Sequence, residues 1–186
     1  QGEDIYIAAY DPDLNVVWDY QLDVANDLYG LGLDNYPDRA LTVATNGQFV
    51  LVGGFATIFD PETMSGPGRE GILLVFSAED GDLLDWELIR GQPGSSHFDQ
   101  VKSIKIDRNR VAFGGSTRGD RNATTFMTGY GELRPNGDLV IKWLSQYNRT
   151  AGPVADEVNS VLLYRNQVIG GGVAGGRFYI QSRFSR

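Results

Sequence analysis

Four short apolar runs between residues 41 and 86 decide which fold the sequence predicts: LTVAT (41–45), FVLVGG (49–54), ILLVFS (72–77) and LLDW (83–86). Asn46 and Gly47 lie in the link between the first two runs, and the polar segment 79–82 joins the last two. Short polar links between alternating apolar runs are typical of β-hairpins. We therefore predict a unit of four antiparallel strands, with a glycine pair ending the second strand and a tryptophan on the fourth.

The same unit recurs along the chain, because runs like the first two stand at 101–106 with 111–115 and at 158–163 with 168–172. Runs like the last two stand at 5–10 with 16–18 and at 126–130 with 139–143, and 178–182 resembles a third strand alone. We expect the tryptophans to pack between neighbouring sheets and the glycines to allow close backbone approach. The predicted repeat positions are Trp18, Trp86, Trp143, Gly53, Gly54, Gly114, Gly115, Gly170 and Gly171.

The repeats predict an all-β fold of β-propeller-like, four-stranded sheets, about three blades in a single domain over residues 1–186. The repeat hairpins lie near 1–23, 40–91, 98–148 and 156–186. Stacked sheets of this kind cover both of their faces. The strand count is thirteen, one more than a closed ring of three blades needs. Three arrangements stay open: part of a longer polypeptide, a ring completed by oligomerisation, and an open array with exposed edges. A β-sandwich is the alternative fold.

Three stretches carry a resemblance to bacterial exported β-propellers. The stretch FSAEDGDLLDW (76–86), followed by Gly91, is similar to the tryptophan-docking part of quinoprotein-like blades. The stretch 4–18 resembles the strand-turn-strand of the seven-bladed repeat type, and 99–115 fits the same repeat. The resemblance implies a propeller fold, an extracellular or periplasmic location and, for the non-enzymatic relatives, a scaffold that docks other proteins. Quinoprotein dehydrogenases hold a quinone and calcium on eight blades; about three repeats without cysteine imply that no cofactor is bound.

The charge is distributed unevenly along the chain. Residues 1–93 carry 17 acidic and 3 basic side chains, whereas residues 94–186 carry 7 acidic and 13 basic ones. This charge dipole is interpreted either as solvated faces or as complementary ends that dock. The overall acidity and the lack of a basic-aromatic cluster argue against nucleic-acid binding. No run of 18 apolar residues is present, so we expect no transmembrane segment.

The sequence predicts no catalytic, cofactor-binding or metal-binding residue. The single histidine, His97, excludes multi-histidine metal sites, and the lack of cysteine excludes thiol chemistry. Asp11, Asp13 and Asn15 have the opening spacing of a calcium loop but lack its glycine and its final glutamate. The many carboxylate pairs single out no glycosidase site.

Two functions follow as hypotheses. The first is a non-catalytic extracytoplasmic structural or protein-interaction module, a subunit of a larger assembly, with protein partners or self-association. The second is a glycan-binding or glycan-cleaving β-propeller. Asn122 and Asn148 begin Asn-x-Thr triplets and are candidate glycosylation sites.

Overall fold

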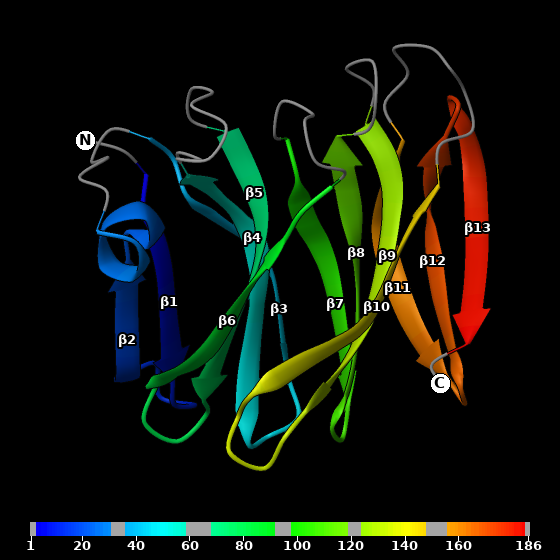
Figure 1. Ribbon diagram of the computed structural model, residues 1–186. Coiled ribbons are helices and arrows are strands. Elements are labelled where there is room, and N and C mark those ends of the chain that lie inside the picture. The colour runs from blue at the N-terminus through cyan, green and yellow to red at the C-terminus, as the bar shows by residue number, and fades with distance from the viewer. Residues whose placement is uncertain are drawn as a thin grey trace.

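The computed structural model describes residues 3–30, 36–58, 68–91, 98–118, 124–147 and 156–184, which form thirteen strands in four antiparallel sheets (Figure 1). Sheet A contains β1 (Ile5–Tyr10) and β2 (Val16–Leu22), followed by the single π-helical turn η1 (Val24–Leu28). Sheet B contains β3 (Arg39–Thr45), β4 (Phe49–Ile58), β5 (Gly68–Ser77) and β6 (Leu83–Ile89). Sheet C contains β7 (Gln100–Asp107), β8 (Arg110–Arg118), β9 (Thr124–Leu133) and β10 (Leu139–Tyr147). Sheet D contains β11 (Glu157–Tyr164), β12 (Gln167–Ala174) and β13 (Arg177–Phe184).

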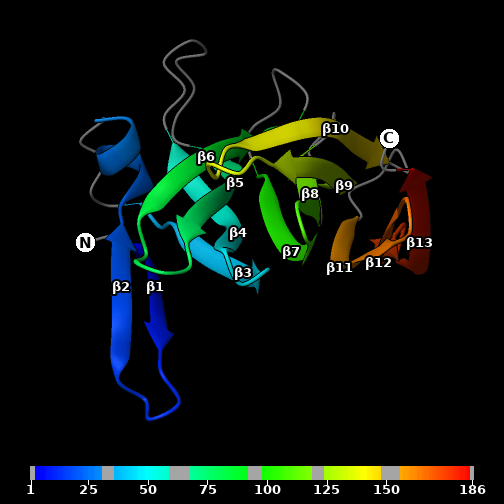
Figure 2. The same ribbon diagram turned by 90° about the horizontal axis from the view of Figure 1, so that it is seen from below.

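The predicted all-β fold of propeller-like, four-stranded repeats is confirmed. Sheets B and C are complete, sheet A holds only a third and a fourth strand, and sheet D only the first three. The four sheets form a single row in chain order, each packed against the next, rather than the two layers of a sandwich (Figure 1). Seen from below, the first strands β3, β7 and β11 lie along one side of the row, and the fourth strands β6 and β10 along the other (Figure 2). The row does not close into a ring.

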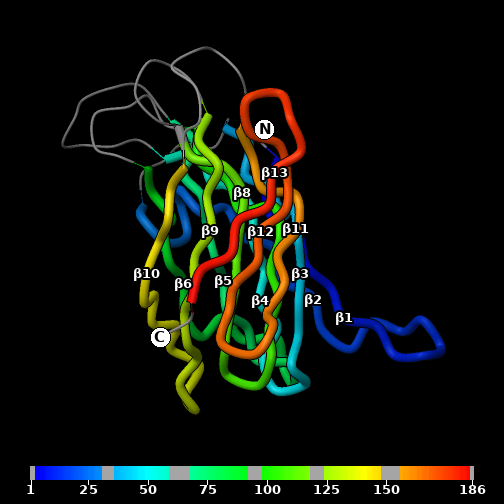
Figure 3. The backbone as a smooth tube through the Cα atoms, turned by 90° about the vertical axis from the view of Figure 1, so that its right-hand side faces the viewer, coloured from blue at the N-terminus to red at the C-terminus, as the bar shows by residue number. Residues whose placement is uncertain are grey.

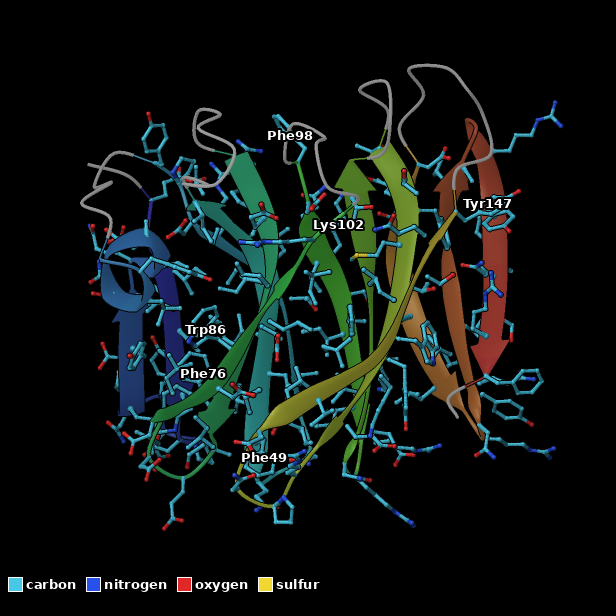
Figure 4. The ribbon with its side chains drawn as sticks, in the orientation of Figure 1. Phe49, Phe76, Trp86, Phe98, Lys102 and Tyr147 are labelled. Atoms are coloured by element: carbon cyan, nitrogen blue, oxygen red, sulfur yellow. The ribbon has the colours of Figure 1, made fainter. Side chains whose placement is uncertain are left out.

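The three layers between successive sheets form the core. Phe76 and Trp86 lie on the side of sheet B that faces sheet A, together with buried Ile5 and Leu22 (Figure 4). Sheets B and C enclose the largest cluster, which contains the fully buried Phe113. A smaller cluster joins sheets C and D. The middle strands of sheets B and C, such as β4, β5 and β9, are therefore buried on both faces, which is why their apolar pattern is nearly continuous.

The first two strands of each repeat share one irregularity, a β-bulge. The register shifts between Ala40 and Thr42 in sheet B, between Val101 and Ser103 in sheet C, and between Val158 and Ser160 in sheet D. At the bulge a backbone carbonyl comes so close to the second strand that only glycine fits. A Cβ at Gly54, Gly115 or Gly172 would lie 1.8, 2.0 and 2.0 Å from the carbonyl oxygens of Arg39, Gln100 and Glu157.

The bulges define which glycines correspond. Gly171 and Gly172 are the counterparts of Gly53–Gly54 and of Gly114–Gly115, because each pair lies opposite its bulge. Gly170 instead corresponds to Val52 and Phe113. The predicted pair in the last repeat is thus displaced by one residue, since three consecutive glycines hide the register in the sequence.

Candidate functional site

The outer face of sheet D is the surface that departs most from the repeat. A Cβ at Gly53 would meet Val101 and Ile104 of the next sheet at 2.7 and 2.8 Å. A Cβ at Gly114 would likewise meet Val158 and Val161 at 2.6 and 2.7 Å. Gly171 is the third member of this series, and no atom of the described residues lies within 4 Å of the corresponding point. The contact between this glycine and the first strand of the next sheet, present in the other two repeats, is therefore absent from the described part of the last one.

The strand next to Gly171 shows the same difference. Ile180 pairs with Gly171 as Leu73 pairs with Gly53 and Thr128 with Gly114. Leu73 and Thr128 are 0% and 1% exposed, whereas Ile180 is 59% exposed. Phe178 on the same face of β13 is 79% exposed. Figure 3 views the molecule from this end, with β13, β12 and β11 in front. Sheet D thus presents to solvent an apolar face that sheets B and C bury.

The opposite end of the row is uncovered at β3. By register, Ala40 and Val43 are the counterparts of Val101 and Ile104, which seat on the preceding sheet. Val43 is 64% exposed and Ala40 is also exposed. The reason is that sheet A lacks the first two strands, which would lie against them. Each end of the row therefore carries one half of an inter-sheet contact.

The two ends differ in charge. Residues 1–30 carry seven acidic side chains and no basic one, and residues 158–186 carry four arginines and no acidic one. Arg177 and Arg183 lie on β13 itself. The uneven charge of the sequence therefore becomes an acidic and a basic end of the row, because chain order and spatial order coincide.

The tryptophans occupy two different register positions. Trp18 pairs with Ala9 and Trp143 with Tyr130, both beside a bulge, whereas Trp86 pairs with Leu74 one residue further along. The Trp18 indole N–H donates to the carbonyl of Ala78 in the next sheet at 3.2 Å. In sheet B the residue beside the bulge is Asp85, whose carboxylate accepts from the Leu139 N–H of the next sheet at 2.6 Å. A residue at this position therefore ties one sheet to the turn of the next.

Trp143 has no such bond, because the sheet that follows it holds no fourth strand. Its buried indole nitrogen finds no hydrogen-bond partner among the described residues, and its ring stacks on Tyr130 with centroids 6.2 Å apart. Trp143 lines an open pocket of about 560 Å³ together with Leu144 and Ser145 of β10 and Ser182, Arg183 and Phe184 of β13. Nearby, Tyr147 stacks on Tyr179 of β13 at 4.8 Å (Figure 4). The pocket marks the edge at which sheet D is incomplete.

The candidate chemical sites of the sequence gather into no cluster. Asp11 accepts from the backbone N–H groups of Asp13 and Asn15 and from the Asn15 amide, which lowers the pKa of Asp11 and describes a hydrogen-bonded hairpin turn. No group of three potential metal ligands occurs within the described ranges. His97, Asn122 and Asn148 lie outside the described residues. A pocket of about 700 Å³ at the hairpin ends of sheets B and C has the buried Phe49 as the one aromatic residue among its described lining.

Three buried aspartates form a recurring feature that the sequence reasoning missed. Asp38, Asp99 and Asp156 each directly precede the first strand of a sheet and are almost fully buried. Their carboxylates accept hydrogen bonds from backbone N–H groups: Asp38 from Val24 and Thr57 at 2.8 and 2.7 Å, Asp99 from Gly91 at 2.6 Å, and Asp156 from Gly175. The signal was present as the pattern Asp-x-(Ala/Val)-x-(Thr/Ser) at 38–42, 99–103 and 156–160. These aspartates hold the start of each repeat in place.

Asp38 should make stability depend on pH. Burial raises the pKa of this carboxyl to about 6 from 3.8, although the two backbone N–H groups act in the opposite direction. Because the folded pKa is the higher one, the stabilisation from protonated Asp38 is complete below about pH 4 and is lost as the pH rises through 6.

We expect the free energy of unfolding to rise by about 1 kcal/mol more in the wild type than in Asp38→Asn when the pH falls from about 7 to about 5. Urea denaturation at several pH values measures this difference. Parallel pH profiles of the two proteins would show that Asp38 does not titrate in this range.

Comparisons of the chain with models of protein families and with curated protein sequences find no match. Fold and site together define a β-propeller-like repeat protein with open, apolar and oppositely charged ends. Within the described segments, no helix is long and apolar enough to span a membrane.

Proposed function

We propose that this protein is a non-catalytic structural and protein-interaction module, a subunit of a larger assembly that is held together through the ends of its row of sheets. The observation that carries the proposal is the uncovered outer face of sheet D, where Ile180 is exposed although its counterparts Leu73 and Thr128 are buried. An apolar face of this kind costs solvation free energy until a partner covers it.

The charges of the two ends support the same role. The basic end around β13 would attract acidic partners and the acidic end basic ones, which speeds encounter and fixes orientation. We place the role in an extracellular or periplasmic setting, on the resemblance of residues 4–18 and 76–86 to exported propeller repeats.

Native size measured by light scattering after gel filtration of an extract from the producing organism tests this proposal. We expect the protein to elute in an assembly well above its own 20.4 kDa. The assembly should shrink when the salt concentration rises from about 0.05 M to about 0.5 M, because salt screens the charged ends.

The variant Ile180→Lys should shift the protein toward the monomer position, and Asn109→Lys, which adds a lysine at an exposed turn between β7 and β8 of the middle sheet C, should not. A wild-type protein that elutes as a monomer at low salt would contradict the proposal.

A further inference from the structure

We infer that the outer face of sheet D binds the first strand of a four-stranded repeat that residues 1–186 do not contain. The face consists of the outward side chains of β12 and β13: Ile169, Gly171, Val173, Phe178 and Ile180. The inference rests on the proposed function, since it names the partner that covers this face.

The chain itself contains this contact twice. Val101 and Ile104 of β7 seat on Gly53, and Val158 and Val161 of β11 seat on Gly114. In both cases the first strand of one sheet lies against the glycine-bearing second strand of the sheet before it. Gly171 reproduces that glycine in the same register, with open space above it. The site is therefore shaped for a strand with two β-branched apolar residues three positions apart.

One polar group of the same contact also has a counterpart on sheet D. The Val161 N–H donates to Ser103 Oγ at 3.1 Å, and Lys102 pairs with Glu157 across the same two first strands. Figure 4 shows Lys102 on β7. By register Ser160 corresponds to Ser103, and Ser160 is exposed. Ser160 can accept the equivalent N–H of an incoming strand.

Charge limits which strands fit. Residues 158–186 carry four arginines and no acidic side chain. A strand with carboxylates at its start, as β11 has at Asp156 and Glu157, would therefore be favoured over a basic one.

A second copy of this chain does not fit the face, although its β3 offers Ala40 and Val43 at the required positions. In that copy the third strand of sheet A, β1, packs on sheet B through Ile5, which is buried. If sheet B of that copy followed sheet D as the next sheet of the row, sheet A of the copy would have to occupy the position of sheet D. β1 of the copy would then overlap β13, because both are third strands. A second copy is thus excluded, and the strand that covers this face belongs to a repeat outside residues 1–186 whose first strand is not covered by another sheet.

The test uses a peptide that reproduces residues 156–164, DEVNSVLLY, and the ¹⁵N-labelled full chain observed by NMR. We expect saturable amide shifts centred on Ile169, Gly171 and Ile180. A peptide with serine in place of the valines that correspond to 158 and 161 should cause none.

Two variants of the protein should bind the peptide with an affinity at least about tenfold lower than that of the wild type. Gly171→Val fills the seat yet should fold normally, because no atom lies within 4 Å of its Cβ and its φ is not positive. Ile180→Lys changes a side chain that is already exposed, and Leu14→Lys should bind as the wild type does.

The absence of saturable amide shifts at peptide concentrations up to about 1 mM would overturn the inference. Shifts centred on Gly53 or Gly114 would overturn it as well, because they would show exchange with a strand of the protein itself. An assembly that persists in the native extract without peptide binding would leave the proposed function standing and remove only this partner.

Discussion

Replacing Gly115 by alanine is expected to lower the free energy of unfolding by at least about 3 kcal/mol. The new Cβ would lie 2.0 Å from the carbonyl oxygen of Gln100 and 3.0 Å from its carbonyl carbon. Both are backbone atoms in the bulge between β7 and β8, so no side chain can turn away to make room. The bulge would have to open, and sheet C lies in the middle of the row with a core layer on each side.

The matched control is Gly171→Ala, a glycine in the same motif whose Cβ would meet no atom within 4 Å. This variant should be neutral or more stable by up to about 1 kcal/mol, because alanine loses less backbone entropy on folding. Urea denaturation of the two variants and the wild type measures the difference. Equal midpoints for the two variants would refute the assigned register.

The second large effect is expected at Phe113, where truncation to alanine should cost about 3–5 kcal/mol. Phe113 is fully buried in the cluster between sheets B and C. Its ring fills the space above Gly129, where a Cβ would lie 2.1 Å from the ring carbon Cζ. Removing the ring leaves a cavity in this cluster that is bounded on one side by the backbone of Gly129, which has no side chain to fill it.

Phe178→Ala serves as its control, because Phe178 is among the most exposed apolar side chains of the described chain. It should change the free energy of unfolding by less than about 0.5 kcal/mol in dilute, purified protein. Thermal unfolding followed by circular dichroism compares the two. A loss at Phe178 as large as that at Phe113 would mean that the outer face of sheet D is covered in the isolated protein.

Much of the fold follows from local sequence patterns. The runs 41–45 and 49–54 alternate with a period of two, and Asn46-Gly47 permits the tight turn between them. Such signals depend only on neighbouring residues, so each expected run lies within one of the strands β1–β13 and the division into hairpins is as expected. The prediction that a glycine pair ends the second strand is wrong, because β4, β8 and β12 continue beyond their glycines. The unequal charge of the two halves was equally visible, since it is a count.

Less of the candidate site could be predicted from the sequence. Glycine residues 170–172 could not be aligned from sequence, because a run of identical residues carries no register. The role of Asp38 was missed because its partners, the N–H groups of Val24 and Thr57, are far away in the chain and only the fold brings them together. Trp86 looked equivalent to Trp18 in its repeat, yet it lies one residue further from the bulge of its strand than Trp18 does.

By itself the sequence determined that four-stranded repeats form and in which order, because hairpins are specified by period and turn residues within about ten positions. Only the tertiary structure decided which faces of those repeats stay open. Gly53, Gly114 and Gly171 are the same residue in the same motif, and they differ only in what lies above them. Burial is a property of the neighbouring sheet, and for the last sheet the described chain places no neighbour there.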